Sequence, residues 1–176
     1  MAEFAFWLCL LLPVYAYLGY PLLIGLIARF RPAPVRQAGS SPSVSIIIAA
    51  HNEAEHIGAK LQTLLHQDYP PEQLRIIVAS DGSTDATVAE ASAIADPRIQ
   101  VLDLPRQGKA HALNAAVAVA GADILVFTDA DNRWASDCLS ELMRAFTDPG
   151  VGAAGGHIEI PHSGAHLGIG DQLYRR

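Results

Sequence analysis

Two aspartates separated by one residue stand directly after an apolar run in this sequence. Residues 124–127 are too few for a helix and are bounded by turn formers, so they predict a strand buried on both faces. Side chains two residues apart in an extended segment point the same way, so Asp129 and Asp131 can converge on a hard divalent cation or on a cation and its ligand. An acidic loop without a ligand is the alternative, and the rest of the chain must decide between them.

Polar residues also follow two other apolar runs. His51, Asn52 and Glu53 come after residues 44–50, and Asp81 ends a second run that starts at position 74. Beside Gly82, the Asp81 carboxylate can accept hydrogen bonds from a planar ligand such as a nucleotide base, or it can cap its own turn. Both interpretations remain open from these residues.

Lys109 follows Gly108 at a predicted helix start, where it can meet phosphate charge or act as a solvated surface charge. It is not a P-loop lysine, because the upstream glycine is missing and Ala110 stands where serine or threonine is required.

Other functional classes of protein are also disfavoured by the sequence. The order His-Asn-Glu-Ala-Glu-His matches neither zinc-protease signature. A net charge of −6 without a basic stripe argues against nucleic-acid binding. Cys9 and Cys138 suggest neither a disulfide framework nor a structural zinc site.

Strand and helix patterns alternate along the chain. Apolar runs predict strands at residues 44–50, 74–79, 99–102 and 124–127, and another in 151–160. Helical spacing predicts helices at residues 53–65, 86–95, 109–120 and from about 136, with Leu113 and Val117 facing inward on the third helix. This alternation predicts a mostly parallel Rossmann-like α/β sheet with helices on both faces. Such sheets bind ligands beyond the carboxyl ends of their strands, so we expect the polar residues to share one rim.

The N-terminal segment differs from the rest of the chain. Residues 4–30 carry no charge before Arg29 and are long enough to cross a bilayer core of about 30 Å, which predicts one transmembrane helix. A secretory signal is disfavoured because a basic n-region is lacking, and a buried amphipathic helix is the other alternative. Arg29, Arg31 and Arg36 favour a cytoplasmic C-terminal side. Residues 31–43 predict a linker, and residues 44–176 the globular domain.

Four short motifs together carry a resemblance to a known family. They are Ser45-Ile-Ile-Ile-Ala-Ala-His-Asn-Glu53, Ser80-Asp-Gly-Ser-Thr-Asp85, Gly108-Lys-Ala-x-Ala-Leu-Asn114 and Thr128-Asp-Ala-Asp131. In this order and spacing they resemble the motifs of family 2 glycosyltransferases over about residues 44–160. The N-terminal segment, with Gly19-Tyr20-Pro21, is similar to that of membrane-anchored bacterial members.

The resemblance implies a GT-A fold and a nucleotide-diphosphate sugar donor, commonly a UDP-sugar. It also implies roles by position: Ala50, His51 and Glu53 would line the nucleoside, Asp81 would contact the base, Lys109 would lie near the nucleotide, Asp129 would face the ribose or donor sugar, and Asp131 would hold Mg²⁺ or Mn²⁺. Such a cation stabilises the charge that develops on a departing diphosphate.

The resemblance is incomplete on the acceptor side. The acidic base and the Gln-x-x-Arg-Trp motif of the family are not recognisable, and the context of Glu159 and Asp171 marks neither as a base. We therefore expect a donor-binding half, with the acceptor-binding half missing or supplied by a partner chain.

The leading hypothesis is an inverting glycosyltransferase that is anchored by a single span in the bacterial inner membrane, with its catalytic domain in the cytoplasm. Its partners would be a nucleotide sugar, the lipid bilayer and a carbohydrate or lipid-linked acceptor, and not a nucleic acid. The alternative is a truncated donor-binding module without catalysis of its own. A sugar-nucleotidyltransferase is disfavoured because residues 49–52 contain no glycine-rich phosphate loop.

Overall fold

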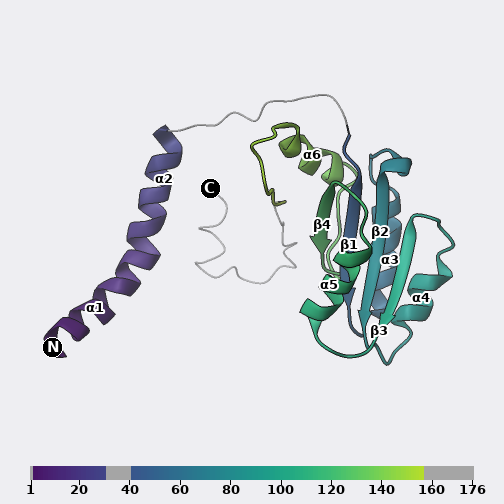
Figure 1. Ribbon diagram of the computed structural model, residues 1–176, viewed down its shortest axis with the longest axis horizontal. Coiled ribbons are helices and arrows are strands. Elements are labelled where there is room, and N and C mark those ends of the chain that lie inside the picture. The colour runs from purple at the N-terminus through teal and green to yellow at the C-terminus, as the bar shows by residue number, and fades with distance from the viewer. Residues whose placement is uncertain (1, 31–40, 157–176) are drawn as a thin grey trace, which may run out of the picture. The chain divides into compact units, whose positions relative to one another are not determined.

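The computed structural model describes residues 2–30 and 41–156, and the chain divides into two compact units (Figure 1). The described residues of the first unit, Met1–Arg36, are helical, and those of the second, Gln37–Arg176, form an α/β unit. Most of the predicted linker, together with Glu159 and Asp171, lies outside the described residues.

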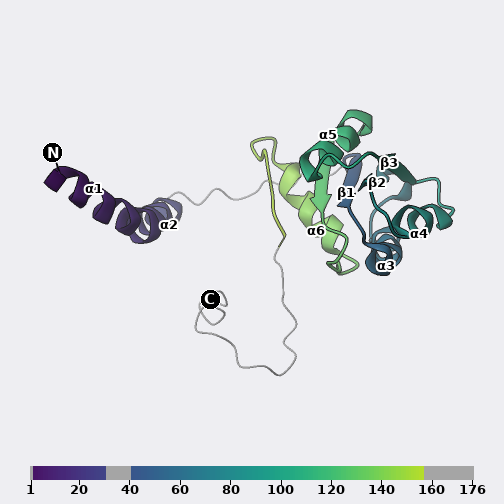
Figure 2. The ribbon, with the colours of Figure 1, turned by 90° about the horizontal axis from the view of Figure 1, so that it is seen from below.

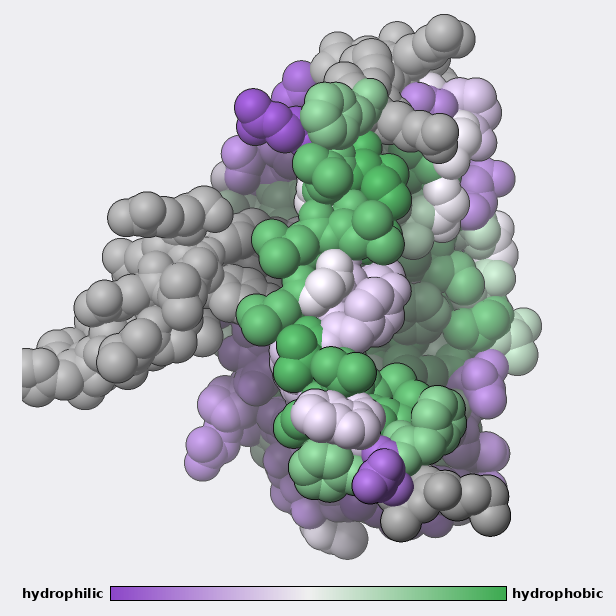
Figure 3. Space-filling model, turned by 90° about the vertical axis from the view of Figure 1, so that its left-hand side faces the viewer, coloured by the Kyte–Doolittle hydropathy of each residue, from purple (hydrophilic) through white to green (hydrophobic). Residues whose placement is uncertain are grey.

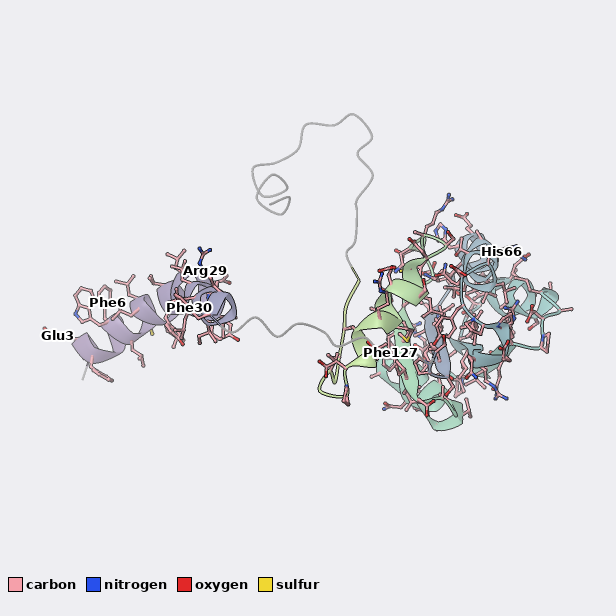
Figure 4. All side chains as sticks on the ribbon, turned by 90° about the horizontal axis from the view of Figure 1, so that it is seen from above. Glu3, Phe6, Arg29, Phe30, His66 and Phe127 are labelled. Carbon is pink, nitrogen blue, oxygen red and sulfur yellow. The ribbon has the colours of Figure 1, made fainter. Side chains whose placement is uncertain are left out.

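The N-terminal unit is one long apolar helix built from three segments. Helix α1 (Ala2–Val14) contains Pro13 and continues through a π-helical turn (Tyr15–Gly19) into α2 (Tyr20–Phe30). Within it, Phe6–Ile27 has a mean hydropathy of 1.9, so by length and composition this segment can cross a membrane. Apolar side chains cover most of its surface in Figure 3, and the charged residues Glu3 and Arg29 lie near its two ends (Figure 4).

The α/β unit is built on a parallel sheet of four described strands in the order β3-β2-β1-β4. The strands are β1 (Val44–Ala50), β2 (Leu74–Asp81), β3 (Ile99–Leu104) and β4 (Ile124–Thr128). Val44 is in register with Leu74 of β2 and with Ile124 of β4. Because all pairs are parallel, the four carboxyl ends meet at one edge of the sheet.

Helices cover both faces of this sheet (Figure 2). Alternate side chains of β1 point to opposite faces, so Ile46 and Ile48 pack in one core cluster and Ile47 in the other. Helices α3 (Ala54–Leu65), α4 (Thr87–Ala93) and α6 (Cys138–Arg144) close the first cluster, and α5 (Lys109–Val119) closes the second. Short 3₁₀ turns occupy Pro71–Gln73 and Ala145–Thr147. The predicted α/β sheet with helices on both faces is confirmed.

One expectation about a strand was wrong, and another is tested only in part. Strand β4 is not buried on both faces: Val126 is buried, but the Phe127 side chain is 55% exposed. The reason is that β4 is an edge strand among the described strands, and Phe127 lies at this edge (Figure 4). Residues 151–156 have no regular secondary structure, and the remainder of the strand predicted in 151–160 falls outside the described residues.

The packing of α5 also differs from expectation. Ala112 and Ala116 are fully buried against the sheet, whereas Leu113 is only partly buried and Val117 is 38% exposed. Alanine side chains let a helix backbone approach a sheet closely, so the small residues form the contact face and the larger valine is displaced from it.

Two buried serines make a matched test of this core. Ser45 in β1 is fully buried and its hydroxyl has no hydrogen-bond partner among the described residues, whereas the buried Ser80 hydroxyl donates to Ser83 Oγ at 2.9 Å. A buried hydroxyl without a partner costs about 1–3 kcal/mol. We expect Ser45→Ala to leave unchanged or raise the free energy of unfolding of the full chain in detergent, and Ser80→Ala to lower it by about 1 kcal/mol. Denaturant titration followed by circular dichroism measures both, and the reverse order would contradict the difference in hydrogen bonding between the two hydroxyls.

Candidate functional site

The loops that follow β1 and β2 are joined by hydrogen bonds at the carboxyl edge of the sheet. His51 Nδ1 lies 2.9 Å from the carbonyl oxygen of Asp81, so a proton on Nδ1 makes a hydrogen bond between the loops. Asn52 has a left-handed backbone (φ 56°), and its Oδ1 accepts from the Thr84 N–H at 2.8 Å. Its own N–H donates to Ser83 Oγ at 3.2 Å. The two loops therefore form one rim segment.

Asp81 connects this segment to the loop that follows β3. Its carboxylate is 4% exposed and accepts from the backbone N–H groups of Gln107 (2.8 Å) and Gly108 (2.9 and 3.0 Å). Arg106 Nη1 lies 3.4 Å from Oδ2. The hydrogen bond from Gln107, together with the other donors, holds the pKa of Asp81 below its usual value. The ionised carboxylate thus fixes the backbone from which Lys109 projects.

Gly82 allows β2 and the β3 loop to approach each other closely. Its φ is 60°, and its N–H donates to the Leu104 carbonyl at 2.8 Å. A Cβ at this position would lie 2.7 Å from both the backbone nitrogen and the Cβ of Arg106. Only glycine fits here without a shift of the chain.

The starts of α3 and α4 are tied together by Asp85. Its Oδ2 accepts from the Ala54 N–H at 3.2 Å, and its Oδ1 accepts from the N–H of Thr87 at 2.9 Å and from the Thr87 hydroxyl. The Thr87 hydroxyl oxygen in turn accepts from the Glu53 N–H at 2.8 Å. The hydrogen bond from the Thr87 hydroxyl is the main cause of the lowered pKa of Asp85. This network fixes the backbone of the 51–53 loop.

Ala50 and Glu53, which are both expected to line the nucleoside, differ in whether their side chains can reach a ligand. The Ala50 side chain is 2% exposed and belongs to the core, so only its main chain can face a ligand. Glu53 precedes α3, where its carbonyl accepts from the N–H groups of His56 and Ile57, and its side chain is half-buried.

The Asp129–Asp131 turn places its carboxylates outside the core. Ala130, between them, is 4% exposed, whereas both aspartates are exposed. Asp129 Oδ1 pairs with Lys109 Nζ at 2.5 Å, and both of these side chains are more than half exposed. In the described part of the chain the Asp131 carboxylate has no hydrogen-bond or ion-pair partner. The structure therefore brings Lys109 and Asp129 together and leaves Asp131 available to a ligand.

A buried lysine beneath this turn was missed by the sequence reasoning. Lys60 of α3 is 2% exposed, and its Nζ donates to Thr128 Oγ1 at 2.9 Å, to the Asn132 carbonyl at 3.2 Å and to Asn132 Oδ1. The same nitrogen lies 4.9 Å from the centre of the Trp134 ring. Burial lowers the pKa of Lys60 to about 8, against the opposing effects of Cys138, Asp129 and Asp131. The signal in the sequence that could have identified it is the position of this lysine among the regularly spaced apolar residues of α3.

A divalent cation at this rim would need oxygen ligands from a bound molecule. Within residues 2–30 and 41–156, no three His, Cys, Asp or Glu side chains are grouped to hold a metal ion. Mg²⁺ sites commonly combine one or two carboxylates with substrate phosphates and water, and Mn²⁺ accepts similar oxygen ligands. The exposed Asp131 carboxylate fits that pattern.

The chain is similar to a known protein family and to proteins of known activity. Residues 45–168 match the family model described as "Glycosyl transferase family 2". The chain is 39% identical over 127 residues to an N-acetylglucosaminyltransferase of Rhizobium leguminosarum bv. trifolii, covering 69% of the chain and 70% of that relative. It is 34% identical over 157 residues to one of Rhizobium sp. (strain N33), covering 85% of the chain but 35% of that relative.

Two solved structures share the fold. A mannosyltransferase of Pyrobaculum calidifontis, in complex with GDP-Man and Mn²⁺, matches with a TM-score of 0.68 and 36% identity over 79% of this chain and 43% of that one. Residues 1–349 of S. aureus TarS, in complex with UDP, match with a TM-score of 0.52 and 21% identity over 69% of this chain and 38% of that one. The second similarity concerns the fold alone. The chain spans less than half the length of both structures.

Gly82 can be tested against a glycine that carries no such constraint. Gly58 lies inside α3 and a Cβ there would meet nothing within 4 Å. We expect Gly82→Ala to lower the free energy of unfolding by about 2 kcal/mol or more, because left-handed backbone strain adds to the clash with Arg106. Gly58→Ala should raise it by about 0.5–1 kcal/mol. Denaturant titration of the full chain in detergent measures both, and equal effects would rule out the close approach at Gly82.

Lys60 should make stability depend on pH. A lowered pKa means that, between about pH 8 and 10.5, the folded protein binds fewer protons than the unfolded chain, so stability rises with pH. The cost of the charged lysine is fully present below pH 8, and its relief by pH 10.5 amounts to about 3 kcal/mol. We expect the unfolding free energy of the natural protein, relative to Lys60→Met, to rise by this order across the window. Tyr69, whose pKa is raised by burial, titrates in both proteins and cancels in the difference. A flat difference would contradict the prediction.

Proposed function

Because the chain belongs to glycosyl transferase family 2, we propose that it binds a UDP-sugar and a divalent cation at the carboxyl edge of its sheet, and transfers the sugar with inversion. The observation that carries this proposal is the Asp131 carboxylate, which has no partner among the described residues, beside the Lys109–Asp129 ion pair. There, the Asp131 carboxylate could bind a cation, and the Lys109 ammonium could bind a diphosphate. The relatives that are N-acetylglucosaminyltransferases support transfer of a sugar.

In this proposal the nucleoside lies against the loops of β1 and β2. The main chain at Ala50 and the side chains of His51 and Glu53 line it, and the region of Asp81 meets the base. The Asp81 carboxylate already accepts backbone hydrogen bonds from Gln107 and Gly108, so its remaining lone pairs would serve the base. In this proposal its main role is to hold the loop that contains Gln107 and Gly108, against which the nucleotide packs.

Lys109 and Asp129 exchange partners when the donor binds. Both side chains are exposed, so an ion pair between them contributes little to stability and is easily opened. Lys109 can then turn toward phosphate oxygens, and Asp129 toward a hydroxyl of the ribose or the donor sugar. Asp131 would hold Mg²⁺ or Mn²⁺, and a cation bound there would stabilise the negative charge of the departing diphosphate. The mannosyltransferase complex with GDP-Man and Mn²⁺ supports a divalent cation in this role.

Transfer would proceed by a single displacement. The acceptor hydroxyl oxygen bonds to the anomeric carbon as the bond from that carbon to the diphosphate oxygen breaks, which inverts the carbon. The acceptor proton passes to a base that we leave unassigned among the described residues. The acceptor would be a carbohydrate or a lipid-linked carbohydrate.

The N-terminal helix would anchor this domain to a membrane. We propose that residues 4–30 span the bacterial inner membrane once, that residues 31–43 link the span to the domain of residues 44–176, and that this domain faces the cytoplasm. The length and hydropathy of Phe6–Ile27 support the span, and Arg29 at its C-terminal end supports the orientation.

A second candidate function is donor binding without independent transfer. The match covers 35% of the N33 relative and 43% of the mannosyltransferase, so acceptor-binding parts of a full enzyme would lie elsewhere. Under this alternative the chain would bind the donor and depend on another chain for transfer.

Calorimetric titration of the full chain in detergent with UDP, with and without Mn²⁺, tests the donor site. We expect Asp131→Asn to weaken Mn²⁺-dependent UDP binding by about tenfold or more, or at least ~1.4 kcal/mol, because a charged cation ligand is lost. Asp68→Asn is the matched control, since Asp68 is exposed and precedes β2 at the opposite edge of the sheet. Replacing UDP with GDP tests which nucleotide base the site prefers. Unchanged Mn²⁺-dependent binding by Asp131→Asn would refute the metal assignment. Transfer from a UDP-sugar by this chain alone would eliminate the binding-only alternative.

A further inference from the structure

The strongest unexplained feature of the α/β unit is the buried ammonium of Lys60. Lysine is rarely fully buried unless it is paired, and the long side chain normally extends until its charge reaches water. Here it ends under the turn that follows β4, where its three hydrogen bonds use all three donors of the ammonium group. Burying a charge in this way costs free energy, so we expect it to have a functional role.

The acceptors of Lys60 stand on both sides of the Asp-x-Asp sequence. Thr128 directly precedes Asp129, and Asn132 directly follows Asp131. The Asn132 side chain also accepts from the Thr128 hydroxyl at 3.0 Å, so the two flanking residues are joined to each other as well as to the lysine. Removing the ammonium would leave the Asn132 carbonyl and amide oxygen without this donor. The turn is therefore closed at its base by one side chain from a distant helix.

The charge of Lys60 is also suited to this place. Asp129 and Asp131 favour its protonated form, although neither contacts it directly. The positive charge of Lys60 offsets part of the repulsion between the two carboxylates, which stand one residue apart. Trp134 covers the ammonium on another side, which shields it from solvent.

We propose that Lys60 is a positioning residue, which holds the turn from Thr128 to Asn132 in the conformation that presents Asp129 and Asp131 to the diphosphate and its cation. The part of this inference that concerns the ligand rests on the proposed function. The part that concerns the turn does not. Lys60 touches neither ligand, and it acts through Thr128 and Asn132.

Trp134 makes the turn observable without any ligand. The sequence contains two tryptophans, so Trp7→Phe leaves Trp134 as the only tryptophan in the full chain, and excitation at a wavelength that tyrosine does not absorb isolates its emission. In that background we compare Lys60→Met, Lys60→Arg and Asn132→Ala with Leu64→Val, a control at a fully buried site on the last turn of α3. Asn132→Ala removes one acceptor from the partly exposed loop side, so it tests the contact even if Lys60→Met does not fold. The first measurement is the emission maximum and acrylamide quenching of Trp134.

We expect Lys60→Met to raise the quenching of Trp134 and to shift its emission, Asn132→Ala to do so more weakly, and Leu64→Val to leave both unchanged. Lys60→Arg, which keeps the charge, should restore part of the change. The second measurement is UDP affinity with and without Mn²⁺: Lys60→Met should lose about tenfold of the Mn²⁺-dependent affinity, while metal-free UDP binding changes little.

Two results would overturn the inference. One is Trp134 quenching in Lys60→Met and Asn132→Ala that equals the control. The other is an equal loss of UDP affinity with and without Mn²⁺, which is the result of general destabilisation. If the natural protein binds no UDP under any condition, the proposed function fails, but the Trp134 measurement still decides whether Lys60 holds the turn.

Discussion

The parallel alignment of β1 between β2 and β4 is the constraint on which the rest of the α/β unit depends. Both faces of β1 are covered by helices, so nearly all of its side chains must be apolar or small, and polar groups can follow only where the strand ends. Because its neighbours run parallel, their ends fall on the same edge. His51, Asp81 and Asp129 are therefore brought to one rim by the packing of residues that carry no chemistry themselves.

The loops of the rim are hydrogen-bonded to each other and not only to their own strands. The buried Asp81 carboxylate binds the backbone after β3, and Asp85 binds the first residues of two helices. Charged acceptors make stronger hydrogen bonds to backbone N–H groups than neutral ones do. Such a frame fixes the backbone of each loop, while Lys109 and Asp131 stay exposed. A site of this kind combines fixed main chain with side chains that are free to exchange partners.

Much of this arrangement could be predicted from local pattern. The strand starting at Val44 and the helix ending at Leu65 follow from apolar periodicity, and the common rim follows from the rule for parallel sheets. The rest depends on contacts across the fold. Lys60 interacts with Asn132, 72 residues away, and nothing near Lys60 in the sequence identifies that partner. The exposure of Phe127 depends on what lies beside β4, which the run 124–127 does not encode.

The charges of the rim explain why its two aspartates need not be equivalent. Lys109 neutralises Asp129 through an exposed ion pair, whereas Lys60 acts on both aspartates from below without contacting either. Asp131 thus presents its carboxylate to solvent, and under the proposed function a cation would bind there. A cation that also carries a diphosphate would bring negative charge with it, and we propose that this charge would attract Lys109 away from Asp129. Donor binding and release of Asp129 would then be one coupled event, in which the Asp129 carboxylate, proposed to face the sugar, would become free only when the diphosphate is in place.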